Sequence, residues 1–238
     1  LFTGHDRTSE LDAFDSLFDS RIDGLVFIAP PVESRPFDAL IERKVPFATL
    51  NAGPEVPGLH FGVDNAAGVR LAMEHLVGLG HTRIAHLAGL PSSADARARV
   101  EAFRSFVDEH RLETFDHQLQ SGDFTPDSGE LLTRSLLAMD HPPTAIFTAN
   151  DDMALGVYRA AQSSNVRIPD QLSVVGFDGA EFGDYLLPGL TTVLQPIGQM
   201  AEACLSAVLD LINDQPIGSS LDFVPELKVL GSTAPPAK

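Results

Sequence analysis

Short apolar stretches alternate with amphipathic ones along most of this chain. Apolar, β-branched runs of strand length lie at residues 24–29, 45–50, 59–63, 84–88, 145–148, 172–177 and 190–194. Apolar side chains recur at helical spacing in residues 37–43, 66–79, 94–110, 126–139 and 153–163. Apolar strands that alternate with helices are typical of parallel sheets with helices on both faces. The pattern therefore predicts an α/β protein of doubly wound architecture.

The two ends of the chain complete this pattern. Residues 1–3 can only be the end of a strand, and a helix is expected over residues 9–19. Because an open sheet centre would leave backbone groups unpaired, we expect the opening strand and helix of this unit to lie upstream of the sequence. A helix from residue 196 to 212 and strands at 221–224 and 226–230 close the fold. The last helix carries one apolar stripe, formed by Met200, Cys204, Val208 and Leu211.

Two polar side chains follow strands of the expected sheet. Asp178 ends the strand at 172–177, and Gln195 ends the strand at 190–194. Ligands of open α/β sheets bind at the carboxyl ends of the strands, so this position favours a binding site. The alternative is structural, with Asp178 capping its loop and Gln195 lying on the surface.

Four further side chains lie at strand ends or helix starts. Arg99, on the first turns of a helix, offers a planar fork of donors, unless it is an exposed helical arginine or Arg97 takes its place. Phe124 either packs in the core or stacks on a ligand. Asn150 and Asn51 each follow a strand, and we expect Asp151, next to Asn150, to be the N-cap of the following helix.

Several motifs, taken together, resemble one known family. They read "RIDGLVF", "DNAAG", "AMEHLVGLGHTRIAHLAG", "GDFTPDSG", "TANDDMALG", "GFD", "LTTVLQPI" and "PELKVLGSTAPP". They are similar to the effector-binding core of the lac repressor family of bacterial transcription regulators, over roughly residues 10 to 236. Three positions depart from the family pattern: Gly179 replaces a second Asp, Ala102 replaces a Gly, and Leu230 replaces an Arg.

The resemblance implies two doubly wound parallel-sheet lobes joined by three crossovers, the periplasmic-binding-protein-like type I fold. One lobe would comprise residues 1–63 and 196–224, and the other residues 64–195 and 225–238. A small polar effector would bind between them. The residues expected to contact it are Arg99, Phe124, Asn150, Asp178, Gln195 and Asn51, with Arg99 and Asp178 facing each other across the cleft.

Charge separates this chain from a DNA-binding domain. It has 238 residues, with 16 Lys and Arg against 33 Asp and Glu, and its net charge is −17. So acidic a surface repels phosphate, and no helix-turn-helix pattern with a basic face is present. We therefore expect contact with operator DNA only through an N-terminal head outside this sequence. The resemblance also implies a homodimer.

Catalytic and metal-binding patterns are lacking. The pairs Asp151/Asp152 and His81/His86 have no third ligand at a recognisable spacing, and no phosphate-binding loop or nucleophile motif occurs. We expect no cofactor and no enzymatic activity. The apolar runs are too short to span a membrane and no leader peptide opens the chain, which favours a cytoplasmic regulator over the alternative, a periplasmic sugar-binding protein of a transporter. The effector is expected to be a sugar or sugar derivative, and the Phe124 position, shared with purine repressors, leaves a purine possible.

Overall fold

The computed structural model describes residues 22–30, 35–53, 55–216 and 218–237. The strand end and helix expected over residues 1–19 lie outside this part. The chain divides into two compact units. The smaller contains residues 1–62 and 197–222, and the larger contains residues 63–196 and 223–238.

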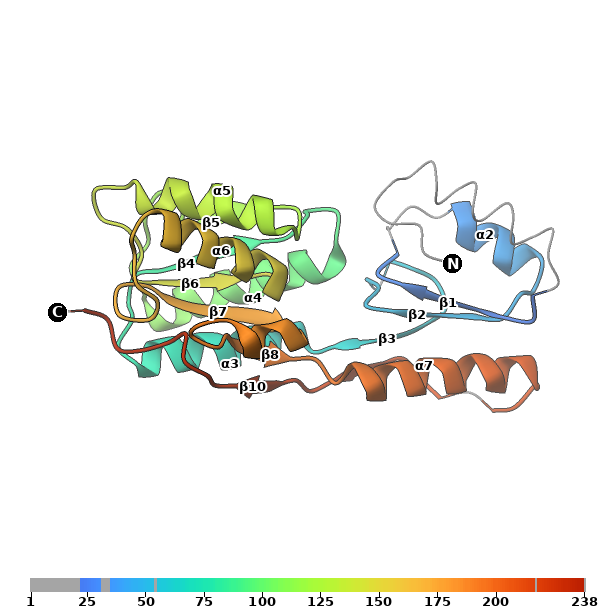
Figure 1. The fold of residues 1–238 in the computed structure, drawn as a ribbon. Helices are drawn as coiled ribbons and strands as arrows, with labels where there is room; N and C mark the ends of the chain where they lie inside the picture. The colour runs from blue at the N-terminus through green and yellow to red at the C-terminus, as the bar shows by residue number, and fades with distance from the viewer. Residues whose placement is uncertain (1–21, 31–34, 54, 217, 238) are drawn as a thin grey trace. The chain divides into compact units, whose positions relative to one another are not determined.

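The smaller unit is built on a sheet of strand order β1-β2-β3-β9. Its strands are β1 (Leu25–Ile28), β2 (Phe47–Leu50), β3 (Leu59–Val63) and β9 (Leu221–Phe223). The first three pair in parallel. Helix α2 (Arg35–Glu42) covers one face and α7 (Ile197–Ile212) the other (Figure 1).

Apolar side chains on both faces hold this sheet in place. Phe37 and Leu40 of α2 pack with Phe47 and Val56 in a buried cluster. The stripe of α7 turns toward the sheet, since Met200, Cys204 and Val208 are buried. The stripe predicted from the sequence is therefore core packing, and Cys204 is the buried thiol that its apolar surroundings predict.

The larger unit has a six-stranded sheet of order β10-β8-β7-β6-β4-β5. Its strands are β4 (Ile84–Ala88), β5 (Leu119–Ser121), β6 (Ala145–Thr148), β7 (Ser173–Asp178), β8 (Thr191–Leu194) and β10 (Glu226–Lys228). All neighbours pair in parallel except β10, which runs antiparallel to β8. A short 3-10 helix, η1 (Glu181–Tyr185), joins β7 to β8.

Helices cover both faces of this sheet. Figure 1 shows α5 (Pro126–Leu137) and α6 (Asp151–Ser163) on one face, and α3 (Asn65–Gly78) and α4 (Ala94–His110) on the other. Helices α5 and α6 approach each other through glycines. A Cβ at Gly156 would lie 2.0 Å from the carbonyl oxygen of Pro126, and one at Gly129 would lie 2.2 Å from that of Met153. Backbone packs on backbone here because neither position carries a side chain.

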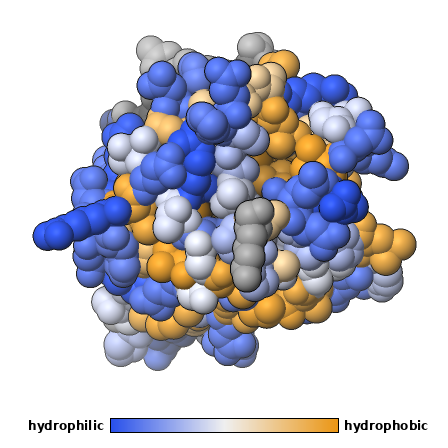
Figure 2. Space-filling model, turned by 90° about the vertical axis from the view of Figure 1, so that its left-hand side faces the viewer, coloured by the Kyte–Doolittle hydropathy of each residue, from blue (hydrophilic) through white to orange (hydrophobic). Residues whose placement is uncertain are grey.

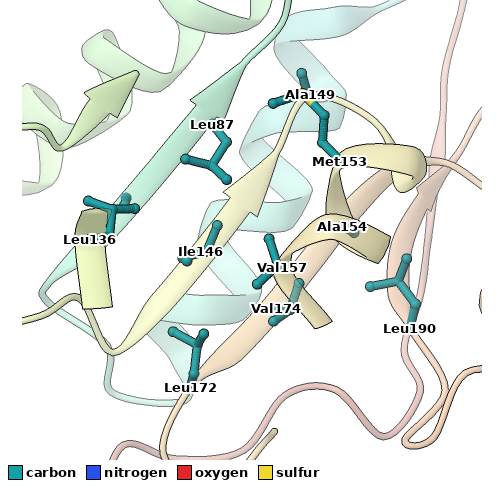
Figure 3. Close-up of a cluster of buried hydrophobic side chains, with 11 residues drawn as sticks. Leu87, Leu136, Ile146, Ala149, Met153, Ala154, Val157, Leu172, Val174 and Leu190 are labelled. Carbon is teal, nitrogen blue, oxygen red and sulfur yellow. The ribbon is translucent and has the colours of Figure 1, made fainter. Parts of the chain in front are cut away.

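The core of the larger unit lies between the sheet and the pair α5 and α6. Its members are fully buried, and Figure 3 shows the side chains of β4, β6 and β7 meeting those of α6. The cluster comprises Ala85, Leu87, Leu136, Ile146, Ala149, Met153, Ala154, Val157, Leu172, Val174 and Leu190. Burial of this many branched side chains fixes the sheet, and with it the strand ends that carry the polar residues.

Side-chain hydrogen bonds hold the C-terminal segment after β10 against the sheet. Ser232 Oγ donates to the carbonyl of Val174 at 2.6 Å and accepts the Thr191 N–H at 2.8 Å. The buried His81 ring contacts the Ala234 carbonyl at 2.9 Å. These contacts explain why β10 ends at Lys228 although a strand is predicted to residue 230. The N–H of Leu230 donates to Thr191 Oγ1 instead of continuing the ladder.

The fold class predicted from the sequence is confirmed. The α/β alternation, the parallel sheets and the helices on both faces are all present. Strand and helix boundaries differ by one to a few residues, as expected where caps and loops decide the end of an element. None of the helices in the described part of the chain is both long and apolar enough to cross a membrane.

Candidate ligand-binding site

Asp178 and Gln195 lie together at the carboxyl edge of the larger sheet. Asp178 is the last residue of β7, and its φ of 108° turns the chain sharply out of the strand. The side-chain amide of Gln195 donates to Asp178 Oδ1 at 2.6 Å, and its backbone N–H lies 3.3 Å from the Asp178 carbonyl. The structure therefore joins two residues that are 17 positions apart in the sequence, as the ends of neighbouring parallel strands.

Arg99 reaches the same edge from α4 and is buried, with 3% of its surface exposed. Its Nε donates to Asn65 Oδ1 at 2.7 Å, and its Nη1 donates to the carbonyl of Ala149. The guanidinium carbon lies 3.6 Å from the centre of the Phe177 ring, close enough for a cation–π contact. The alternative of an exposed helical arginine is thus excluded, and Arg99 has a fixed geometry.

The neighbouring Arg97 contacts the turn that precedes its own helix. Arg97 Nη1 donates to the carbonyls of Pro91 and Ser92, in the turn that precedes α4.

Arg99 and Asp178 form an ion pair within one unit. Arg99 Nη1 lies 3.9 Å from Asp178 Oδ1, and both residues belong to the larger unit. The prediction that they face each other across a cleft is therefore wrong, because β7 and α4 bring them to one sheet edge. Burial lowers the pKa of Arg99, which the carboxylates of Asp178, Asp95 and Asp151 oppose. Burial raises the pKa of Asp178, while Arg99 and the hydrogen bond from Gln195 pull it down.

Asn150 begins helix α6. Its Oδ1 accepts the N–H of Met153 at 3.0 Å, which is the N-cap hydrogen bond. Its Nδ2 donates to the Phe124 carbonyl at 3.1 Å, so Asn150 also holds the loop before α5. The N-cap predicted at Asp151 is wrong by one residue, because Asp151 already lies in the first turn of the helix.

Asp151 is instead a buried connector of three elements, with 1% of its surface exposed. Its Oδ1 accepts from Thr192 Oγ1 of β8 and its Oδ2 accepts from the Ala180 N–H after β7, both at 2.6 Å. Burial raises the pKa of Asp151 to about 7 against these hydrogen bonds. Gly176 leaves the space for this carboxyl, since a Cβ there would lie 2.1 Å from Asp151 Oδ1.

Phe124 lies between β5 and α5 in a left-handed conformation, with φ of 66°. Its ring is only partly buried and packs against the core cluster. The ring also covers Gly89, where a Cβ would lie 2.1 Å from the Phe124 Cζ. A glycine at the end of β4 thus makes room for an aromatic face at the same sheet edge as Asn150.

Asn51 lies in the smaller unit, directly after β2, with a φ of 53°. Its N–H donates to the Phe61 carbonyl at 2.9 Å. Asn51 therefore ends a strand, as predicted. The other five candidates all belong to the larger unit.

The arrangement offers both donors and acceptors to a polar ligand. Arg99 offers donors, Asp178 offers acceptors, Gln195 offers both, and Phe124 offers an apolar face. No group of three or more His, Cys, Asp and Glu that could hold a metal occurs in the described parts of the chain. Burial, together with the charge of Arg99, lowers the pKa of His86 to about 4, so this ring is neutral near pH 7. The ring is stacked on Phe147.

Two residues of this site were not predicted. Asn65 joins Arg99 to Asp95, because its Nδ2 donates to Asp95 Oδ1 at 2.8 Å while its Oδ1 accepts from Arg99. The signal for Asn65 is its place directly after the N-cap Asp64, at the start of a helix on the carboxyl side of a strand. The connecting role of Asp151 depends on β8, which is distant in the sequence, so no local pattern indicates it.

Comparison with known proteins gives a consistent result. Residues 73–233 match the sequence model of a family described as periplasmic binding protein-like domain. The chain is 33% identical over 215 residues to the HTH-type transcriptional repressor PurR of Vibrio cholerae, covering 90% of this chain and 64% of that protein. The chain thus spans less than two thirds of the length of this relative.

Solved structures agree in fold. A transcriptional regulator CelR–cellobiose complex superposes with a TM-score of 0.88 and 27% identity, over 96% of this chain and 71% of that one. The lac repressor dimer bound to operator and the anti-inducer ONPF gives a TM-score of 0.85 and 29% identity, over 97% and 80% of the two chains.

Proposed function

Because this chain belongs to the periplasmic-binding-protein-like family, as the effector-binding core of a lac-repressor-type regulator, we propose that it binds a small polar effector at the carboxyl edge of the larger sheet. Effector binding would shift the conformational equilibrium of the protein and so control DNA binding by the whole protein. The alternative, a sugar-binding protein of a transporter, is not favoured, since the relatives named above are transcription regulators.

One observation carries the proposal. Arg99, Asp178 and Gln195 come from three different elements and meet at the carboxyl edge of a parallel sheet. A guanidinium only donates, a carboxylate only accepts and an amide does both, which together match the hydroxyl groups of a sugar. The partly exposed Phe124 adds a surface for the apolar face of a sugar ring or for a purine. Asn51 would contribute from the smaller unit.

A thermal-shift screen tests the proposal. Neutral sugars, polyols, sugar derivatives and purines are added to the protein, and a ligand that binds only the folded state raises the melting temperature. Sugars come first because the regulator in the cellobiose complex has the same fold, and purines second because of the purine-type repressor among the relatives. Calorimetry on each hit gives the dissociation constant.

Variants of Asp178 show whether a hit occupies this site. Asp178→Ala is expected to weaken binding by about 1–3 kcal/mol, because a buried ligand hydroxyl then lacks its acceptor. Asp178→Asn is expected to weaken binding less, since the amide keeps one acceptor. Asp140→Asn, in the loop before β6, changes the same charge at the opposite end of the sheet and is the control. Unchanged affinity in both Asp178 variants would mean that the ligand binds elsewhere than at this edge of the sheet.

The partners of the whole protein follow from the same proposal. We propose a homodimer that contacts operator DNA through a head outside these residues, acting in the cytoplasm. The net charge of −17 supports this, because such a surface repels duplex DNA. On the face drawn in Figure 2, apolar side chains reach the surface in patches among hydrophilic ones, and exposed apolar patches of this kind are typical of subunit contacts.

A further inference from the structure

Three helices of the larger unit begin at the edge that carries Arg99 and Asp178. Helices α4, α5 and α6 follow β4, β5 and β6 directly, so their N-termini lie at the carboxyl ends of these strands. The free N–H groups and the positive end of the helix dipole commonly bind anions at such a position. Whether this edge can hold an anion therefore depends on what already occupies the helix ends.

Side chains of the protein already occupy all three helix ends. Ser93, Thr125 and Asn150 are the N-caps, and each accepts an N–H from the first turn of its helix. Each first turn also carries an acidic side chain: Asp95 in α4, Asp127 in α5, which pairs with Arg159 at 3.2 Å, and Asp152 with the buried Asp151 in α6. The helix dipoles are thus compensated from within, and a ligand anion would meet like charges.

The guanidinium of Arg99 at this edge already makes hydrogen bonds within the protein. Two donor positions of Arg99, Nε and Nη1, are bonded to Asn65 and to the Ala149 carbonyl. The planar fork that would clamp a phosphate or carboxylate in a bidentate manner is therefore partly used.

Several carboxyl groups lie near the guanidinium of Arg99. Asp95, Asp151 and Asp178 act on Arg99, and Asp95 and Asp152 act on Asp178. Among the described residues, the carboxylates of Asp95, Asp152 and Asp178 lie near Arg99, so an anionic ligand would meet negative charges at this edge.

From these contacts we infer that the effector site selects for polyhydroxylated ligands that are neutral or carry an amine, and against those that carry a phosphate or a carboxylate. The inference rests on the proposed function, because it concerns the ligand of that same site. It names the charge class of the effector, which neither the family nor the fold fixes.

The sign of the field can be measured without knowing the effector. Small nitroxide probes that differ only in charge, one cationic and one anionic, are added separately to the isotope-labelled protein, and their effects on amide proton relaxation are compared. The amides of Gly179, Ala180 and Gln195 report on the site. Those of Thr82 and His141, at the amino end of the same sheet, serve as the reference, because the whole chain is acidic.

We expect the cation-to-anion ratio of relaxation to be about threefold higher at the site than at the reference amides, as a potential of order kT would produce. Asp152→Asn removes one carboxylate in the first turn of α6 and is expected to lower the ratio at the site alone. Asp140→Asn, the matched control at the other end of the sheet, is expected to leave it unchanged. A ratio at the site equal to or below the reference would overturn the inference.

Matched ligands test selectivity directly. Glucose, glucosamine, glucuronate and glucose 6-phosphate are compared by calorimetry, as are the corresponding derivatives of any sugar found in the screen. Each anionic member is expected to bind at least about tenfold more weakly than its neutral parent, and tighter binding of an anion contradicts the inference. If no sugar or purine binds, the proposed function fails, while the nitroxide ratio still decides the sign of the field.

Discussion

Asp151 is a buried carboxyl group beside the candidate ligand-binding site. It links α6, β8 and the turn after β7, and burial raises its pKa from 3.8 to about 7. A carboxyl with a raised pKa holds its proton more tightly in the folded than in the unfolded chain. Its contribution to stability is therefore present in full below pH 4 and is lost as the pH rises through about 7. Each tenfold difference in proton affinity between the two states corresponds to about 1.4 kcal/mol.

The substitution Asp151→Asn tests whether Asp151 makes stability depend on pH in this way. The amide does not titrate, so the free energy of unfolding of the variant should fall less between pH 4.5 and 7.5 than that of the wild type. Urea unfolding at several pH values measures the difference. The variant is less stable at low pH, because Asn has one acceptor oxygen for the two donors, Thr192 and Ala180. Parallel curves for the two proteins would show that Asp151 is ionised throughout this range.

Phe124 combines packing with an open face. Its ring lies over Gly89 and against the core, so removing it costs stability as well as any ligand contact. Phe124→Leu keeps most of the packing and loses the flat aromatic surface. We expect this variant to weaken effector binding by about 1 kcal/mol with a small change in melting temperature, on the scale of an aromatic contact. A lower melting temperature with unchanged affinity would assign Phe124 to the core alone.

Helices α5 and α6 depend on two glycines for their close approach. Adding a methyl group at Gly156 places it 2.0 Å from a backbone oxygen of α5, and a backbone cannot rotate away as a side chain can. Gly156→Ala is therefore expected to lower the free energy of unfolding by at least about 1–3 kcal/mol, as overpacking does.

Gly78→Ala is the matched control for that prediction. Gly78 also lies in a helix, and a Cβ there meets no atom within 4 Å. Alanine has the higher helix propensity, so this change is expected to raise stability by up to about 1 kcal/mol. Equal changes in the free energy of unfolding for the two substitutions would mean that α5 and α6 can move apart without loss of stability.

The sequence predicts elements better than it predicts contacts. Strands such as β4 and β7 are predicted correctly because they are apolar on both faces and are followed by capped helices or sharp turns. The meeting of Asp178 with Gln195 also follows from the sequence, since both end neighbouring strands. The sequence does not predict that Arg99 is bonded to Asn65 and Ala149, because these partners lie 34 and 50 residues away and are brought near only by packing. The contact of Asp151 with Thr192 of β8 is not predicted either, because the two residues lie 41 positions apart in the sequence.

At the scale of the whole molecule, the exposed apolar side chains indicate where a subunit contact can form. The apolar stripe of α7 is largely buried against its own sheet. In the larger unit, Tyr185 and Leu187 are 76% and 93% exposed. Leu187 borders a hollow that is also lined by Tyr158, Leu186 and Pro188. The hollow has a mixed lining that also includes Arg159 and Gln162. An aromatic side chain and an exposed leucine beside such a lining are typical of a subunit contact.

We predict that this region lies in the interface of the proposed homodimer. Leu187→Asp places a charge there without disturbing the fold, because the side chain is almost fully exposed. Light scattering of the full-length protein is expected to give a dimer for the wild type and at least a tenfold weaker dimer for Leu187→Asp, since each ~1.4 kcal/mol of charge desolvation changes the dissociation constant tenfold. Leu131→Asp, at a 69% exposed leucine of α5, is the control and should leave the dimer intact. A wild-type monomer at high concentration would rule out the dimer, and an unaffected Leu187→Asp dimer would place the interface elsewhere.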